Sequence, residues 1–134
     1  MISPTLSVMN IWNFCEFHRY MVEQEFIRPG DMNLNILQGP REYRIDILPH
    51  DIKLELKAKF EQHLEWLRPL DHLNRATGGF EAAIQFMMAQ DCTDMLEKFW
   101  KITTDLNWSR NEDLLTVVPE LKQLLKYKPE GLRE

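Results

Sequence analysis

Ile2 to Trp12, ISPTLSVMNIW, is the stretch that decides the fold. Most of its positions are apolar or β-branched, which predicts a buried β-strand centred on Thr5–Ile11. A strand buried inside a parallel sheet needs hydrogen-bonding neighbours on both of its edges. Nothing ahead of Met1 can supply one of these neighbours. We therefore expect residues outside this chain to complete the sheet.

The segments that follow predict a second strand parallel to the first. Asn13 stands at the N-cap position of a helix that continues to about Glu25. The sequence Arg28–Asp31 (RPGD) is typical of a type II turn, and Asn33–Leu37 (NLNIL) is typical of a strand. Strand, helix and strand in this order form a βαβ crossover, which makes the two strands parallel.

The chain then changes from mixed α/β to helical near residue 70. Tyr43–Leu48 (YRIDIL) alternates as a short third strand does, and a helix follows from Pro49 to about Leu67. Later helical patterns cover residues 78–90, with Gly78 at the start, then 93–106 and 110–127. We predict an α/β protein in which residues 1–70 hold the βαβ unit and its following helix. Residues 71–127 form a helical segment, and residues 128–134 form a frayed tail.

Bulk composition narrows the classes of function. The net charge is −5 and the basic residues are interspersed with acids, which argues against binding to nucleic acid or to anionic membranes. No apolar run is long enough to span a membrane, and the N-terminus lacks the pattern of a secretory signal. Cys15 and Cys92 lie far apart in helical patterns and are most simply buried small hydrophobic residues. We expect a cytoplasmic protein.

Residues capable of chemistry are scattered through the sequence. No two of His50, His63 and His72 have the i,i+4 spacing of metal ligands on one helix face, and no HExxH or CxxC motif accompanies them. We therefore predict no metal site and no catalytic residue, with His63 and His72 on a solvated helix and turn. His18, on the first helix, is expected at the boundary of the core.

Polar side chains follow the first two predicted strands. Asn10 comes after the first strand, and Gln38 after the second. Ligands of parallel α/β sheets bind at the carboxyl ends of the strands, where amide side chains suit a polar ligand. The alternative is equally physical, because asparagine is a common cap and Gly-Pro a common turn.

Three stretches together resemble the C-terminal part of radical S-adenosylmethionine enzymes of the twitch/SPASM-related group. They are SVMNIWNFCEFHRYMVEQE (7–25), NLNILQGPREYRIDILPHDIK (33–53) and FWKITTDLNWSRNEDLLTVVPELKQLL (99–125). The resemblance covers nearly the whole chain but only about the last third of such an enzyme. It implies that residues 1–70 are the remnant of a partial (β/α) barrel, with two or three strands, followed by a mostly helical second half.

This resemblance also implies cofactors that the chain itself does not hold. In the family, a CxxxCxxC loop binds a 4Fe–4S cluster, above which S-adenosylmethionine is cleaved to a radical. The chain has only Cys15 and Cys92, so this motif is absent. By analogy, Asn10 and Gln38 would reach the rim of the cofactor cavity in a completed barrel.

Three hypotheses follow. In the first, the chain is a fragment or split piece of such an enzyme, inactive alone, and the missing N-terminal barrel portion is its partner. The second is a free-standing helical module that binds a partner protein through its last three helices. The third and weakest is a small metal or cofactor protein that uses the histidines.

Overall fold

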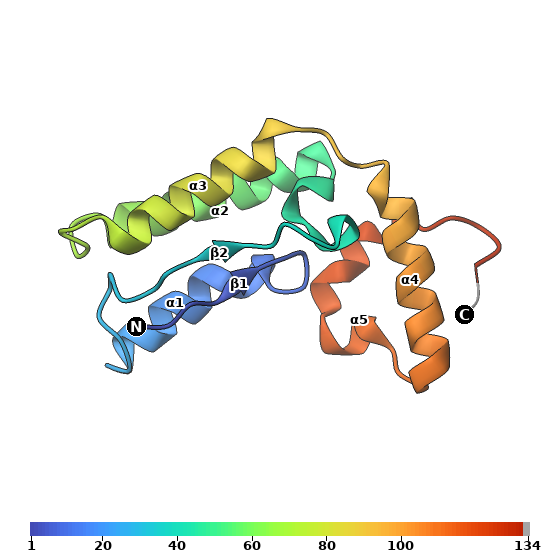
Figure 1. Cartoon of the computed structure of the whole chain (residues 1–134), viewed down its shortest axis with the longest axis horizontal. Coiled ribbons are helices and arrows are strands. Elements are labelled where there is room, and N and C mark those ends of the chain that lie inside the picture. The colour runs from blue at the N-terminus through green and yellow to red at the C-terminus, as the bar shows by residue number, and fades with distance from the viewer. Residues whose placement is uncertain (133–134) are drawn as a thin grey trace.

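The computed structural model describes residues 1–132. It is mostly helical with one small parallel sheet, a mixed α/β arrangement (Figure 1). The strands are β1 (Thr5–Leu6) and β2 (Asn35–Ile36). The helices are α1 (Phe14–Glu23), α2 (His50–Leu67), α3 (Arg75–Ala89), α4 (Met95–Arg110) and α5 (Leu114–Val117). Short 3-10 segments are η1 (Ile11–Asn13), η2 (Arg41–Tyr43), η3 (Ile45–Ile47) and η4 (Pro119–Tyr127).

The predicted parallel pairing is confirmed. Thr5 pairs with Asn35 and Leu6 with Ile36, and α1 forms the crossover between the two strands. The pairing extends toward the N-terminus through a bridge between Ile2 and Met32. Three β2-side N–H groups donate to β1-side carbonyls: Asn33 to Ile2, Asn35 to Pro4 and Leu37 to Leu6.

The first strand is shorter than its sequence predicts, and only one of its faces is buried. It ends at Leu6 because the N–H groups of Asn10 and Ile11 both donate to the Ser7 carbonyl, which turns the chain. Leu6 and Val8 are fully buried, but Thr5 is exposed. The prediction of a buried strand that continues to Ile11 is therefore wrong.

The predicted third strand at Tyr43–Leu48 is also wrong. This segment forms η2 and η3, in which N–H groups bond three residues back, for example Ile47 to the Arg44 carbonyl at 3.3 Å. Its alternation does not separate two faces, because Ile45, Asp46 and Ile47 are all buried. No barrel is present among residues 1–132, whose sheet has two strands.

Helices α2 and α3 pack along each other and cover one side of the sheet (Figure 1). The predicted helix ending at Leu67 is confirmed, but α3 begins at Arg75, so Gly78 lies inside it. Gly79 allows β2 to approach α3 closely, since a Cβ at Gly79 would lie 3.1 Å from that of Leu34. None of the helices in the described part of the chain is both long and apolar enough to cross a membrane.

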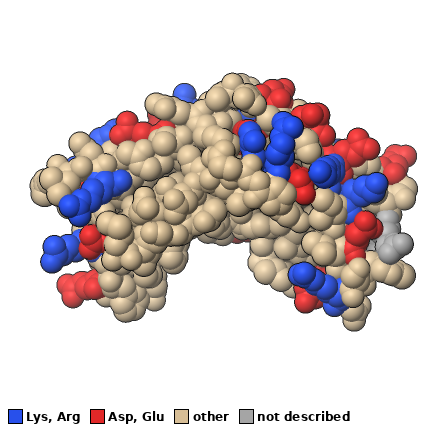
Figure 2. Space-filling view, viewed as in Figure 1, with Lys and Arg blue, Asp and Glu red and all other residues tan. Residues whose placement is uncertain are grey.

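The C-terminal helices form the second arm of an arch (Figures 1 and 2). The helical pattern predicted over 110–127 is divided, because α5 ends at Val117 and η4 begins at Pro119. The indole of Trp100 in α4 donates to the Leu124 carbonyl at 3.0 Å, which fixes η4 against α4. Asn13 donates to Glu120 at 2.7 Å and so links this arm to η1. Of the predicted frayed tail, residues 133 and 134 lie outside the described residues.

Candidate functional site

The structure places Asn10 and Gln38 just beyond the carboxyl ends of β1 and β2, as predicted, but both side chains bond back to their own strands. The Asn10 amide accepts from the Ser7 N–H at 2.9 Å and donates to the Thr5 carbonyl at 2.9 Å. Gln38 donates to the Ile36 carbonyl at 3.3 Å. Asn13, the predicted N-cap, makes no side-chain cap bond to its helix.

These bonds engage three backbone groups at the outer edges of the sheet, the Ser7 N–H and the Thr5 and Ile36 carbonyls. Alternate residues of a strand direct their backbone groups to opposite edges, and the β1 carbonyls that accept from β2 belong to Ile2, Pro4 and Leu6. Thr5 and Ser7 therefore direct their backbone groups away from β2, and Asn10 occupies the position of a neighbouring strand. Exposed edges left without such cover are sites of pairing with other chains.

A cavity of about 310 Å³ lies at this same carboxyl end. It is lined by residues of the segments that follow the two strands, by the C-terminal half of α4, and by α5 with the segment that leads into it. The lining residues are Met9, Tyr43, Thr103, Leu106, Asn107, Arg110, Glu112, Leu114 and Val117. Neither Asn10 nor Gln38 is among them.

The position of Tyr43 in this cavity is fixed by its surroundings. Its carbonyl accepts from the Val8 N–H at 3.1 Å, which ties the turn after β1 to η2. Its ring packs edge-on against Phe99 of α4, with centroids 6.0 Å apart. Burial raises the pKa of Tyr43, the nearby Glu42 adds to that rise, and Arg110 opposes it. The phenol is therefore neutral at physiological pH and available as a hydrogen-bond donor.

The histidines occupy places that the sequence did not indicate. His18 is fully buried and His63 is 6% exposed, so the predictions of a boundary residue and of a solvated one are wrong. His18 Nδ1 lies 2.8 Å from His63 Nε2, and His18 Nε2 lies 2.9 Å from the Pro29 carbonyl. In a neutral pair, His18 Nε2–H donates to this carbonyl and His63 Nε2–H donates to His18.

Burial sets the charge state of this histidine pair. Both rings pack against Phe80, at centroid distances of 5.3 and 4.7 Å. Desolvation lowers the pKa of His18, and desolvation together with His18 and Arg19 lowers the pKa of His63 to about 4. The pair is neutral near pH 7, where it joins α1, α2 and the turn at residues 28–31.

A second polar cluster consists of Arg44, Asp46, Lys53 and Cys92. It holds η3 against α2 and against the segment that leads into α4. Arg44 forms a bidentate ion pair with Asp46, whose carboxylate also accepts from the Cys92 thiol at 3.6 Å. Lys53, which is 4% exposed, donates to the Gln90 carbonyl at 2.7 Å. Burial lowers the pKa of Lys53, against the effect of the neighbouring acids. The ion pairing explains why Asp46 can be buried in the middle of a hydrophobic segment.

The cysteine and acidic side chains decide whether the chain itself could bind an iron–sulfur cluster or a metal ion. Cys15 and Cys92 are both free and buried, as predicted. Burial raises the pKa of Cys15 to about 12, so its thiol stays protonated. Within residues 1–132, no group of three or more His, Cys, Asp or Glu side chains is arranged to hold a metal ion. The residues present do not fit an iron–sulfur cluster, which needs several thiolates.

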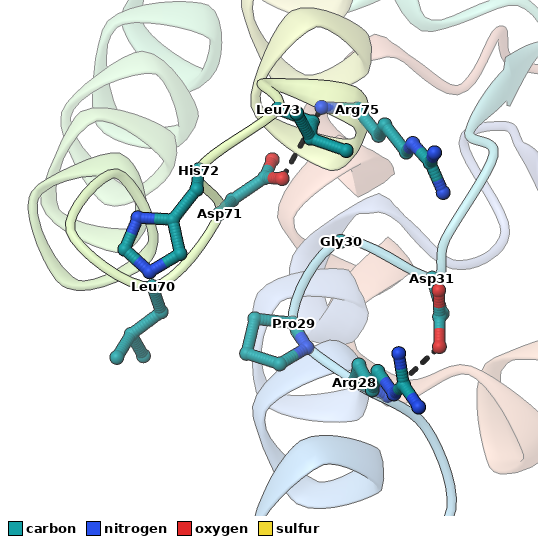
Figure 3. A pocket seen from close by; sticks show the side chains of 9 residues that line it. All are labelled: Arg28, Pro29, Gly30, Asp31, Leu70, Asp71, His72, Leu73 and Arg75. Atoms are coloured by element: carbon teal, nitrogen blue, oxygen red, sulfur yellow. Dashed lines mark hydrogen bonds between the residues drawn. The ribbon is translucent and has the colours of Figure 1, made fainter.

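Another cavity, of about 370 Å³, lies at the amino end of β2. Figure 3 shows that it is formed between the turn at residues 28–31 and the connection at residues 70–75. The Asp71 carboxylate accepts from the N–H groups of Arg75, at 3.2 Å, and Thr77, at 2.8 Å. Burial alone would raise the pKa of Asp71, but these donors bring it below its usual value. The N-terminus of α3 is therefore already occupied by a carboxylate.

Gly30 shows why this second cavity is a packing junction. Its φ lies outside the left-handed region, so the predicted type II turn is wrong. A Cβ at Gly30 would lie 2.6 Å from Asp71 Oδ1. Glycine is needed at this position because the turn approaches the buried carboxylate closely.

The chain matches no protein-family model, no curated protein and no solved structure. The sequence pointed to the carboxyl end of the sheet through Asn10 and Gln38, but it did not single out the cavity residues Tyr43, Thr103 and Arg110. These come from segments far apart in the chain, and each has an ordinary local explanation, such as a basic residue in the last turn of a helix.

Proposed function

We propose that this chain is the closing βαβ unit and helical cap of a radical S-adenosylmethionine enzyme, and that the cluster-binding part lies outside these 134 residues. The observation that carries the proposal is the parallel β1–β2 pair with α1 as its crossover. Parallel strands belong to larger sheets covered by helices, and an isolated two-stranded sheet has little stability. The stretches quoted above for this family cover η1 and α1, then β2 to the start of α2, and then the chain from within α4 to η4; β1 comes just before the first of them.

In this proposal the outer edge of β1 receives the strand that precedes it in the barrel. The incoming strand would replace the two Asn10 bonds to Ser7 and Thr5, since these are the backbone groups that a neighbour would engage. The freed amide of Asn10 would then be available at the carboxyl end, where such sheets bind ligands, and Gln38 lies at the same end. The chain alone supplies no cluster ligands, and no chemical step is assigned to it.

Coexpression provides the test. The chain is produced anaerobically alone and together with the product of the coding sequence that lies directly upstream, and iron, sulfide and 5′-deoxyadenosine formation from S-adenosylmethionine are measured. We expect about four irons per complex and cleavage only in the coexpressed sample. A coexpressed sample with no stable complex, no iron and no cleavage would contradict the proposal.

One observation favours the second candidate, a free-standing helical module. Because Asn10 and Gln38 already bond to three backbone groups at the sheet edges, the chain has less need of a neighbouring strand. Exposed apolar side chains also lie on the C-terminal arm, where Val117 is 74% and Leu106 38% exposed. This candidate predicts a monomer that unfolds cooperatively and stays a monomer beside the upstream product, as measured by analytical ultracentrifugation.

A further inference from the structure

The cavity at the carboxyl end of the sheet contains more hydrogen-bond donors than the protein itself uses. The neutral phenol of Tyr43 lines the same cavity.

Two further donors lie in the last turns of α4. The Asn107 Oδ1 accepts from the Leu114 N–H at 3.1 Å, which fixes the amide plane and leaves its Nδ2 group as a donor. Arg110, three residues later, lines the cavity and forms no ion pair with any described residue. Residues three apart on a helix lie on one face, so these donors converge.

The remaining walls limit the ligand's size and charge. Met9, Leu106, Leu114 and Val117 are apolar, which favours a hydrophobic body. Glu112 lies in the lining with Arg110, so the two charges nearly cancel. A monoanion can pair with the guanidinium, whereas a dianion would be repelled by the Glu112 carboxylate.

We propose that this cavity binds a small monocarboxylate with an apolar body. The carboxylate pairs with Arg110 and accepts from the Asn107 amide, while the hydrocarbon part packs against Leu106, Leu114 and their apolar neighbours. The site lies within the described chain and does not require the sheet to be completed. It therefore stands independently of the function proposed above.

The ligand test uses hexanoate, with hexanamide as the uncharged match and succinate as the dianion. Each is titrated into the full chain, with binding followed by isothermal calorimetry and by ¹H–¹⁵N spectra. We expect hexanoate to bind with a dissociation constant of about 1–10 mM, and the other two to bind at least about tenfold more weakly. The shifted amides should belong to the end of α4 and the segment into α5. Equal binding of hexanoate and hexanamide, or no hexanoate binding up to about 50 mM, would overturn the proposal.

Two variants test the residues themselves. Arg110→Gln should weaken hexanoate binding about tenfold or more, whereas Lys101→Gln, which removes the same charge from α4 outside this cavity, should leave it unchanged. Unchanged hexanoate affinity in Arg110→Gln, or an equal loss of affinity in Lys101→Gln, would refute the assignment.

Discussion

The buried histidine pair makes a sharp prediction about stability and pH. The pKa of His63 is about 4 in the folded chain, against about 6.5 when unfolded. Because the folded pKa is the lower one, the unfolded state binds the proton more readily, and stability is lost as the pH falls below about 6.5. This contribution is complete above that pH. It is lost progressively down to about pH 4.

The magnitude follows from the shift. A difference of about 2.5 pKa units corresponds to about 3.4 kcal/mol once both states are protonated, and to about 2 kcal/mol at pH 5. The pKa of His18 is lowered as well, which adds loss in the same direction. Carboxylates with lowered pKa values, such as Asp71, titrate below this window and do not contribute to it.

The assay is urea unfolding at pH 7.5 and pH 5.0, monitored by tryptophan fluorescence and circular dichroism. The wild-type chain should lose about 2 kcal/mol or more between the two conditions. His63→Gln retains a donor near His18 but does not titrate, so its free energy of unfolding should fall clearly less between the two pH values. His72→Gln removes an exposed histidine and should behave as the wild type does.

The reasoning would be refuted if the wild-type free energy of unfolding changed by less than about 0.5 kcal/mol, or if His63→Gln kept the full pH dependence. A direct NMR titration of the imidazole nitrogens in the wild-type chain gives the same answer if the variant does not fold. A His63 ring that protonates near its ordinary pKa of about 6.5 would contradict the structure.

Three further substitutions or reactions test other contacts. Gly30→Ala forces the Asp71 carboxylate away from the α3 N-terminus and should cost about 1–3 kcal/mol in urea unfolding, whereas Gly78→Ala, inside α3 with no neighbour within 4 Å, should stabilise by about 0.5–1 kcal/mol. Asp46→Ala leaves the half-buried Arg44 unpaired and should cost about 3 kcal/mol; a loss below about 1 kcal/mol in the same assay would show that the ion pair is not important. Cys15, with its pKa raised to about 12, should resist iodoacetamide at pH 8 until the chain is unfolded, and rapid native alkylation seen by mass spectrometry would contradict its burial.

The sequence by itself determined the local elements whose signals are short-range. The apolar residues of the first strand, the NLNIL segment and the helix between them predicted a parallel βαβ unit, and the stripe ending at Leu67 predicted α2. These succeed because a period of two or of 3.6 residues reports directly which side of an element is buried. The position of Asn10 and Gln38 beyond the strand ends followed in the same way.

Only the tertiary structure decided how far each strand extends and what the polar residues contact. Tyr43–Leu48 alternates like a strand, but burial of Asp46 beside Arg44 removes the two-sided pattern, and local bonds replace a ladder. His18 and His63 are 45 positions apart in the sequence, and their contact depends on the packing of α1 against α2. Thr103 is likewise an ordinary helical threonine until α5 and the strand ends enclose it. Local sequence carries no signal for such long-range contacts, because they depend on packing between elements.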